Sequence, residues 1–124
     1  MKAPETSRGV TFSLRLVAPD DGRDEVVKTF RSVLGPIRGS AGCLRCSLLE
    51  DVQQSNQLQL SVDWKRQEDF ERHVKSDVFR RVLQATELAA ELPELQIRTV
   101  TGVRGMGLLR EILGCEEDRP PPCE

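Results

Sequence analysis

The chain has 124 residues, a length typical of one domain. Hydrophobic residues make up 38% and charged residues 31%, which is enough apolar material for one core beneath a polar surface. The 18 basic and 20 acidic side chains are mixed along the chain, so no basic run favours a nucleic-acid partner. No apolar stretch approaches the roughly 18 residues of a membrane span, and none reads as a secretory signal. We therefore expect a cytoplasmic protein with neither a nucleic-acid nor a membrane partner.

The chain begins with a predicted strand followed by a helix. Residues 10–17 alternate between apolar and polar side chains, which is typical of a half-buried strand. A turn cluster at 19–22 follows, and then apolar residues recur every three or four positions, as in an amphipathic helix. Either Asp21 or Asp24 is expected to cap this helix.

A proline and a glycine-rich segment mark the end of the first helix. Pro36 lies late in the helical pattern, so the helix is expected to end or kink near 34–35. Residues 39–42, Gly-Ser-Ala-Gly, lead into a second strand over 43–50. A polar loop of hairpin length separates it from residues 57–64, which give the cleanest alternation in the chain.

The second half predicts a helix, a strand and a short terminal helix. The helix starts near Gln67, with an interruption expected at 76–77, because both side chains there compete for backbone hydrogen bonds. After Pro93, residues 95–103 alternate as a fourth strand, and 106–113 are apolar enough for a further helix. The expected buried side of the long helix comprises Phe70, His73, Val74, Val78, Val82 and Leu83.

The order of elements predicts an α+β fold of the ferredoxin-like β-α-β-β-α-β kind with an extra C-terminal helix. We expect a flexible N-terminus over 1–9, one domain over 10–103, the helix over 104–114 and a disordered tail over 115–124. Both long helices should cover one face of the sheet. The other face is semi-polar and either meets water or packs on a second sheet; it carries Thr11, Ser13, Arg15, Gln59, Ser61 and Asp63.

Four cysteines are present, and two of them form a C-x-x-C motif. Such spacing is compatible with a redox pair or half of a zinc site. However, residues three apart on a regular strand point to opposite faces, so the thiols of Cys43 and Cys46 should diverge. A second C-x-x-C is missing and His73 is the only histidine, so we expect no metal and interpret these two as buried structural thiols. Cys123 lies in the proline-rich tail, together with Cys115 just before it.

Three segments together resemble the antibiotic biosynthesis monooxygenase superfamily. They are Gly42-Cys43-Leu44 at the entry to the second strand, Asp63-Trp64-Lys65 at the end of the third, and the run 68–79, Glu-Asp-Phe-Glu-Arg-His-Val-Lys-Ser-Asp-Val-Phe. The resemblance covers roughly residues 10–103. It implies a homodimer in which two four-stranded sheets face each other in a dimeric α+β barrel.

The resemblance also implies an activity, since many members are cofactor-independent oxygenases of aromatic or quinol-like substrates. Others degrade haem, but Leu83 stands where those carry the iron-ligating histidine, and the first strand lacks their asparagine. The chain has no tyrosine, whereas anthrone-oxidising members use one.

Two residues are candidates for chemistry. His73 is the only side chain that titrates near neutrality without a large shift, so it is a candidate general base; the alternative is a structural helix histidine. Trp64 either lines a pocket and donates its N–H, or anchors the core. The candidate substrate contacts are Phe12, Phe70, Phe79 and Arg15, although phenylalanines are more often core, and Arg15 shares its face with Asp63, which favours an interface ion pair.

Two functions therefore remain open. The first is a monooxygenase without a cofactor that acts on a quinol or polycyclic phenol. The second is a non-catalytic dimeric module that binds a small hydrophobic ligand or simply assembles. The terminal helix either covers a pocket in its own chain or packs onto the dimer mate.

Overall fold

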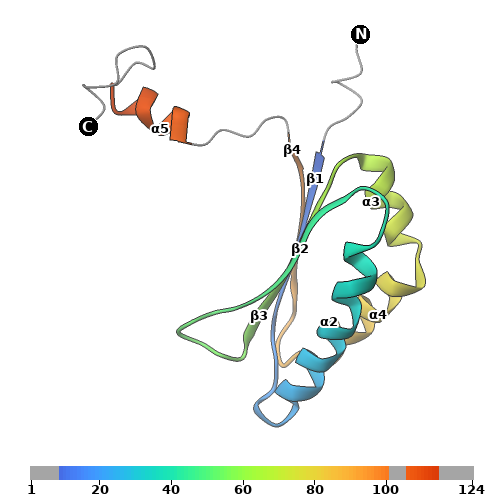
Figure 1. Cartoon of the computed structure of the whole chain (residues 1–124). Coiled ribbons are helices and arrows are strands. Elements are labelled where there is room, and N and C mark those ends of the chain that lie inside the picture. Colours follow the sequence, from blue (N-terminus) through green and yellow to red (C-terminus); the bar gives the residue numbers. More distant parts are fainter. Residues whose placement is uncertain (1–8, 101–105, 115–124) are drawn as a thin grey trace.

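A four-stranded antiparallel sheet forms the centre of the molecule, as the computed structural model shows for residues 9–100 and 106–114 (Figure 1). The strands are β1 (Gly9–Val17), β2 (Cys43–Glu50), β3 (Gln57–Trp64) and β4 (Glu94–Val100), in the order β2-β3-β1-β4. The helices are η1 (Asp20–Gly22), α2 (Arg23–Arg38), α3 (Gln67–Val74), α4 (Asp77–Thr86) and α5 (Met106–Ile112). This arrangement confirms the predicted ferredoxin-like α+β fold.

Some expectations lie outside the described residues. They concern the N-terminus up to residue 8, the end of the strand predicted over 95–103, and the tail from 115 with Cys115 and Cys123. No helix in the part of the chain that the structure describes is long and apolar enough to cross a membrane.

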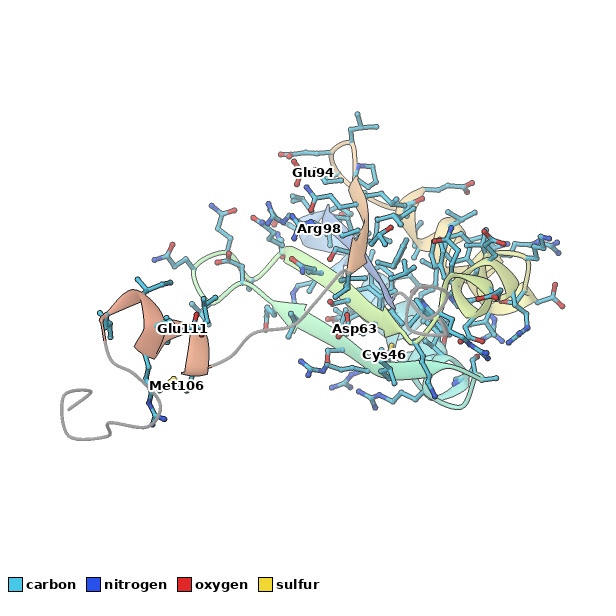
Figure 2. All side chains as sticks on the ribbon, turned by 90° about the horizontal axis from the view of Figure 1, so that it is seen from above. Cys46, Asp63, Glu94, Arg98, Met106 and Glu111 are labelled. Carbon is cyan, nitrogen blue, oxygen red and sulfur yellow. The ribbon has the colours of Figure 1, made fainter. Side chains whose placement is uncertain are left out.

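Helices α2, α3 and α4 cover one face of the sheet, and α5 lies on the opposite side (Figures 1 and 2). The period-2 alternation of the strands sends every second side chain beneath these helices. The buried strand residues are Val10, Phe12, Leu14, Leu16, Leu58, Leu60, Val62 and Trp64. Burying each large apolar side chain contributes about 1.5–3 kcal/mol, so the core between this face and the helices accounts for most of the stability.

An end or a kink of the first helix was expected near Gly35, and the end is wrong, because α2 continues through Pro36 to Arg38. Gly35, directly before the proline, has no Cβ to clash with the proline ring, so it tolerates the helical conformation. The last turn is held by the buried side chain of Ile37 and by the N–H of Gly39, which donates to the carbonyl of Gly35 at 3.0 Å.

The predicted aspartate cap of this helix is also wrong. The N-cap position is Gly22, which follows the 3-10 turn η1 and makes no side-chain capping bond. Asp21 lies inside that turn, and Asp24 lies in the first turn of α2, where its negative charge faces the positive end of the helix dipole.

The interruption predicted at 76–77 is confirmed by the break between α3 and α4. Ser76 caps α4, since its Oγ accepts a hydrogen bond from the N–H of Phe79 at 3.2 Å. The change of helix direction alters which side chains are buried. Val74 and Leu83, both expected to be buried, are 39% and 44% exposed.

The predicted divergence of the two cysteine side chains is wrong because β2 contains a bulge. Cys43 pairs with Trp64 and Arg45 pairs with Asp63, so Leu44 has no partner position on β3. The extra residue restores Cys46 to the inner face, opposite Val62. Leu44 instead is 66% exposed.

A close contact between Gly42 and Asp69 joins the start of β2 to α3. Gly42 has φ +87°, and a Cβ placed on it would come within 2.1 Å of the Asp69 carboxyl group. The Gly42 carbonyl also accepts a hydrogen bond of 2.8 Å from the N–H of Lys65, just after β3. Only glycine satisfies both the positive φ and the close approach.

We expect Gly42→Ala to destabilise the protein by at least about 2 kcal/mol, because the added methyl group combines backbone strain with a clash against a buried carboxylate. Urea denaturation provides the measurement. Gly39→Ala is the matched control: its φ is −84° and a Cβ there meets neighbours only from 3.6 Å, so its stability should change by less than about 0.5 kcal/mol. Equal stability of the two variants would contradict the account of the junction.

Candidate functional site

A cluster of aromatic rings lies between the sheet and the helices at the end of β3. The rings of Trp64 and His73 have centroids 4.8 Å apart and planes tilted by 34°. His73 meets Phe79 edge-on, at 5.3 Å and 78°. Trp64 is 1% exposed and His73 is 5% exposed. The two candidates for chemistry are therefore direct neighbours in a buried setting.

The three phenylalanines predicted to contact a ligand belong to the same cluster. Phe12 on β1 lies 6.2 Å from Phe70 and 5.7 Å from Phe79, ring centroid to ring centroid. All three are buried. We name the group formed by Phe12, Trp64, Phe70, His73 and Phe79 the aromatic cluster. The structure thus brings together five of the six candidate residues.

The local sequence explains how the cluster forms. Trp64 is the last residue of β3, with an inward side chain, and α3 begins at Gln67 after a short turn. Phe70 and His73 are three positions apart on α3, so they share its inner face. Ser76 then turns the chain: its hydroxyl donates to the carbonyl of His73 at 2.6 Å, and its Oγ caps α4 so that Phe79 returns to the cluster.

The buried position of His73 determines its charge state. Desolvation lowers the pKa of its imidazole below the ordinary 6.5. The ring is therefore neutral at pH 7 and has a nitrogen lone pair available to accept a proton.

The indole of Trp64 contributes a donor without an acceptor. Its Nε1 is the buried side-chain polar atom in the described residues that has no hydrogen-bond partner. Leaving a buried donor unsatisfied costs about 1–3 kcal/mol. An incoming oxygen atom would remove that cost, so the cluster combines one proton acceptor and one free hydrogen-bond donor.

Arg15, the sixth candidate, lies on the opposite face of the sheet from the aromatic cluster. Its Nη1 is 3.3 Å from Oε1 of Glu94, and both side chains are largely exposed. It lines a hollow of about 220 Å³ together with Ser13, Gln59, Glu94, Gln96 and Arg98. Figure 2 labels Glu94 and Arg98 on β4. The side chain of Arg15 therefore faces the hollow on the open face of the sheet and cannot contact a ligand in the aromatic cluster.

Asp63 is on the open face as predicted, but its contacts within the chain are not to Arg15. It accepts a hydrogen bond from the hydroxyl of Thr11 at 3.0 Å, and its Oδ2 is 3.9 Å from Nε of Arg45. An ion pair of such exposed groups contributes at most about 1 kcal/mol. An Arg15–Asp63 pair could form only between two copies of the chain.

Sequence reasoning missed the role of Asp69, which is 1% exposed. Its carboxylate is 3.3 Å from Nε of Arg66 and 3.2 Å from Nη1 of Arg72. The signal that could have found it is the spacing: basic residues three before and three after one acidic residue on a helix converge on it.

The described residues contain no group of three or more His, Cys, Asp or Glu side chains that could hold a metal ion.

The fold and the buried cluster define a small α+β domain with a candidate site between sheet and helices. The family model of the antibiotic biosynthesis monooxygenases matches residues 10–85, which span β1 through most of α4. The chain belongs to this family. No curated protein matches the sequence.

Solved structures share the fold at low sequence identity. A conserved protein from Methanosarcina mazei has a TM-score of 0.70 at 14% identity, over 77% of this chain and 96% of that one. A protein from Pseudomonas aeruginosa has a TM-score of 0.66 at 21% identity, over 80% and 98%. A structure named antibiotic biosynthesis monooxygenase has a TM-score of 0.66 at 14% identity, over 77% and 99%. At such identities the likeness shows the fold alone.

Burial of His73 predicts a pH dependence of stability. The unfolded chain binds a proton at His73 near pH 6.5, whereas the folded chain resists it until a lower pH. As the pH falls through about 6.5, the free energy of unfolding should fall, with a slope of up to about 1.4 kcal/mol per pH unit. The loss ends below the folded pKa, where both states are protonated.

Urea denaturation between about pH 7 and pH 5 measures this effect, and His73→Phe is the control. Because His73 is the only histidine, the variant should show a much flatter profile in this window. Parallel profiles for the two proteins would show that His73 does not titrate abnormally.

Proposed function

We propose that the protein is a cytoplasmic, cofactor-independent monooxygenase that acts on a quinol or polycyclic phenol. The observation that carries this proposal is the direct contact between Trp64, whose N–H lacks an acceptor, and the neutral His73. Membership of the monooxygenase family supports the reaction type.

The proposed chemistry needs three functions from the protein. His73 accepts the proton of the phenolic hydroxyl as a general base. The indole N–H of Trp64 donates a hydrogen bond to the phenolate oxygen, where negative charge develops. The surrounding rings of Phe12, Phe70 and Phe79 exclude water and suit a flat aromatic ligand. The electron-rich anion passes an electron to dioxygen, and the substrate radical and superoxide combine to form a hydroperoxide. Loss of water from this hydroperoxide leaves one oxygen atom on the substrate as a new carbonyl, so the substrate supplies the electrons and no resident cofactor is required.

A substrate must open the cluster to reach these groups, because both Trp64 and His73 are buried. The corner between α3 and α4 is the proposed entrance. Its backbone turns at Lys75 and Ser76, and Phe79 beyond it covers one side of the His73 ring. Moving this corner outward uncovers His73 while β3, in the middle of the sheet, keeps Trp64 in place.

Oxygen uptake by the purified protein with a panel of quinols and anthrones, without added cofactor, tests the activity. We expect uptake above the autoxidation blank. Trp64→Phe, which retains a ring but removes the donor, should lower the rate by about a hundredfold, and His73→Phe should lower it by a similar factor.

Arg80→Ala is the matched control for these two variants. Arg80 lies on α4 and is exposed, and among the described residues its guanidinium pairs with the exposed Asp77 at 3.4 Å, so its removal should leave the rate unchanged. Substrate turnover that survives both Trp64→Phe and His73→Phe would place the chemistry elsewhere.

A non-catalytic ligand-binding or assembly module is the second candidate, and the tight packing of Trp64 favours it. The hollow on the open face and a larger one of about 520 Å³ between α2 and β2 both lie away from Trp64 and His73. If no member of the panel is oxidised but an aromatic ligand changes the emission of Trp64, this second function is supported instead.

We also propose that two copies pair through their open sheet faces. The face is neither a core nor a fully charged surface: Ser13, Ser61 and Ser47 form a row of small side chains across its middle. Around this row lie charges of both signs, among them Arg15, Arg45, Asp63 and Glu94, which can complement a second copy related by a two-fold axis. The apolar side chains of α5 are exposed on the same side of the sheet, which adds surface for the partner to cover (Figure 2).

Sedimentation at micromolar concentration tests the pairing. The wild-type chain should be a dimer, and Ser61→Glu should shift it toward monomer, because it places two like charges near the centre of the interface. Ser55→Glu, in the exposed loop before β3, adds the same charge elsewhere and should remain dimeric. A wild-type monomer would refute the proposed interface.

A further inference from the structure

The bulge in β2 brings two thiols to one face of the sheet. Cys43 and Cys46 pair with Trp64 and Val62, which are two residues apart on β3 and both point beneath the helices. Leu44, the unpaired residue of the bulge, accounts for the difference from a regular strand. The C-x-x-C motif is therefore a pair of neighbours and not two separate thiols.

The register also limits the distance between the two cysteines. Cys43 and Cys46 pair with two residues that are two positions apart on β3. Cα atoms two positions apart on a strand are separated by about 6.6–6.8 Å. A disulfide requires Cα atoms about 4.4–6.8 Å apart, so the pair is at the upper end of that range. A disulfide also requires Cβ atoms about 3.5–4.5 Å apart, closer than same-face neighbours on a strand, so the backbone at Cys43 must move toward Cys46 for the bond to form. Cys43 is the first residue of β2 and adjoins the bulge, which is where the strand pairing is least regular.

The two thiols differ in how firmly they are held. Cys46 is 3% exposed (Figure 2 labels it on β2), and its carbonyl accepts hydrogen bonds from Nε and Nη2 of Arg38 at 3.0 and 2.9 Å. Cys43 is only partly buried. Burial raises the pKa of both thiols, that of Cys46 to about 11, and the proximity of Cys43 adds to the shift at Cys46. The mutual effect agrees with the register.

We propose that Cys43 and Cys46 form a reversible disulfide beside the aromatic cluster. The more accessible thiolate of Cys43 attacks a low-molecular-weight disulfide, such as oxidised glutathione, and releases one small thiol. The thiolate of Cys46 then displaces the second small thiol. The two cysteines lose two electrons and two protons, and one small disulfide is reduced to two thiols. This site is independent of the proposed oxygenase chemistry.

Trypsin provides a direct test because it cleaves after Arg45, between the two cysteines. Full-length protein with Cys115→Ser and Cys123→Ser is equilibrated with reduced and oxidised glutathione at about pH 8.5, where more thiolate forms. Thiol exchange is first stopped with acid. The free thiols are then alkylated with iodoacetamide before digestion. We expect peptides 39–45 and 46–65 to be joined by a disulfide and to separate on reduction.

Trp64 gives a second readout, since it is the only tryptophan and lies directly opposite Cys43. Its emission should fall as the linked peptide accumulates and recover with dithiothreitol. Cys46→Ser in the same background should yield only the mixed disulfide at Cys43, with no linked peptides.

Two cysteines that are close in sequence form a disulfide readily even in an unfolded chain. Comparing the folded and unfolded protein therefore shows how much the fold itself favours the bond. The equilibrium constant for disulfide formation should be about tenfold larger in the folded protein than in concentrated urea. An equal or smaller constant in the folded protein would overturn the proposal, because the bulge would then not favour the bond. So would oxidation that yields only glutathione adducts or bonds between chains.

Discussion

The carboxylate of Asp69 packs against the backbone of Gly42, and three segments of the chain meet at this contact. Two arginines, Arg66 and Arg72, neutralise the buried charge from the solvent side. The Gly42 carbonyl accepts the N–H of Lys65, which ties the start of β2 to the end of β3. A buried carboxylate is stable only when paired, so the position of α3 is coupled to the glycine and to both arginines. The positions of Phe70 and His73, on the same helix, follow from this contact.

The sheet has two faces that fold and function use differently. The inner face supplies the core, and the end of β3 places Trp64 within it. The outer face carries a row of serines and exposed ion pairs, which alone would contribute little to stability. Strand β4 lies at the edge, and Leu95 and Ile97, which share the helix side with the buried Leu14 and Phe12, remain about half exposed. The monomer therefore leaves apolar surface uncovered at its edge and on α5.

Regular periodicity predicted most of the fold, and local exceptions account for the errors. Alternation in residues 10–17 and 57–64 gave the two central strands, because each has one wholly buried face. The bulge at Leu44 could not be inferred, since an inserted residue leaves no mark in composition and reverses the facing of every later side chain. The continuation of α2 past Pro36 could not be inferred either, because it depends on the burial of Ile37 in the folded protein. For the cluster, the sequence indicated Trp64 and His73, but their contact depends on the position of α3, which the contact between Gly42 and Asp69 fixes.

The unpaired indole of Trp64 links stability to binding. A buried N–H without a partner carries a local cost of about 1–3 kcal/mol, which the packing of the large indole ring must offset in the unliganded state. That free energy is recovered only if an acceptor reaches the nitrogen. No acceptor from the described residues does so, although His73 lies against the ring. A ligand oxygen that enters the cluster would gain this hydrogen bond in a low-dielectric site, where it is stronger than in water. The unpaired indole N–H of Trp64 is thus the feature of the core that packing alone does not explain.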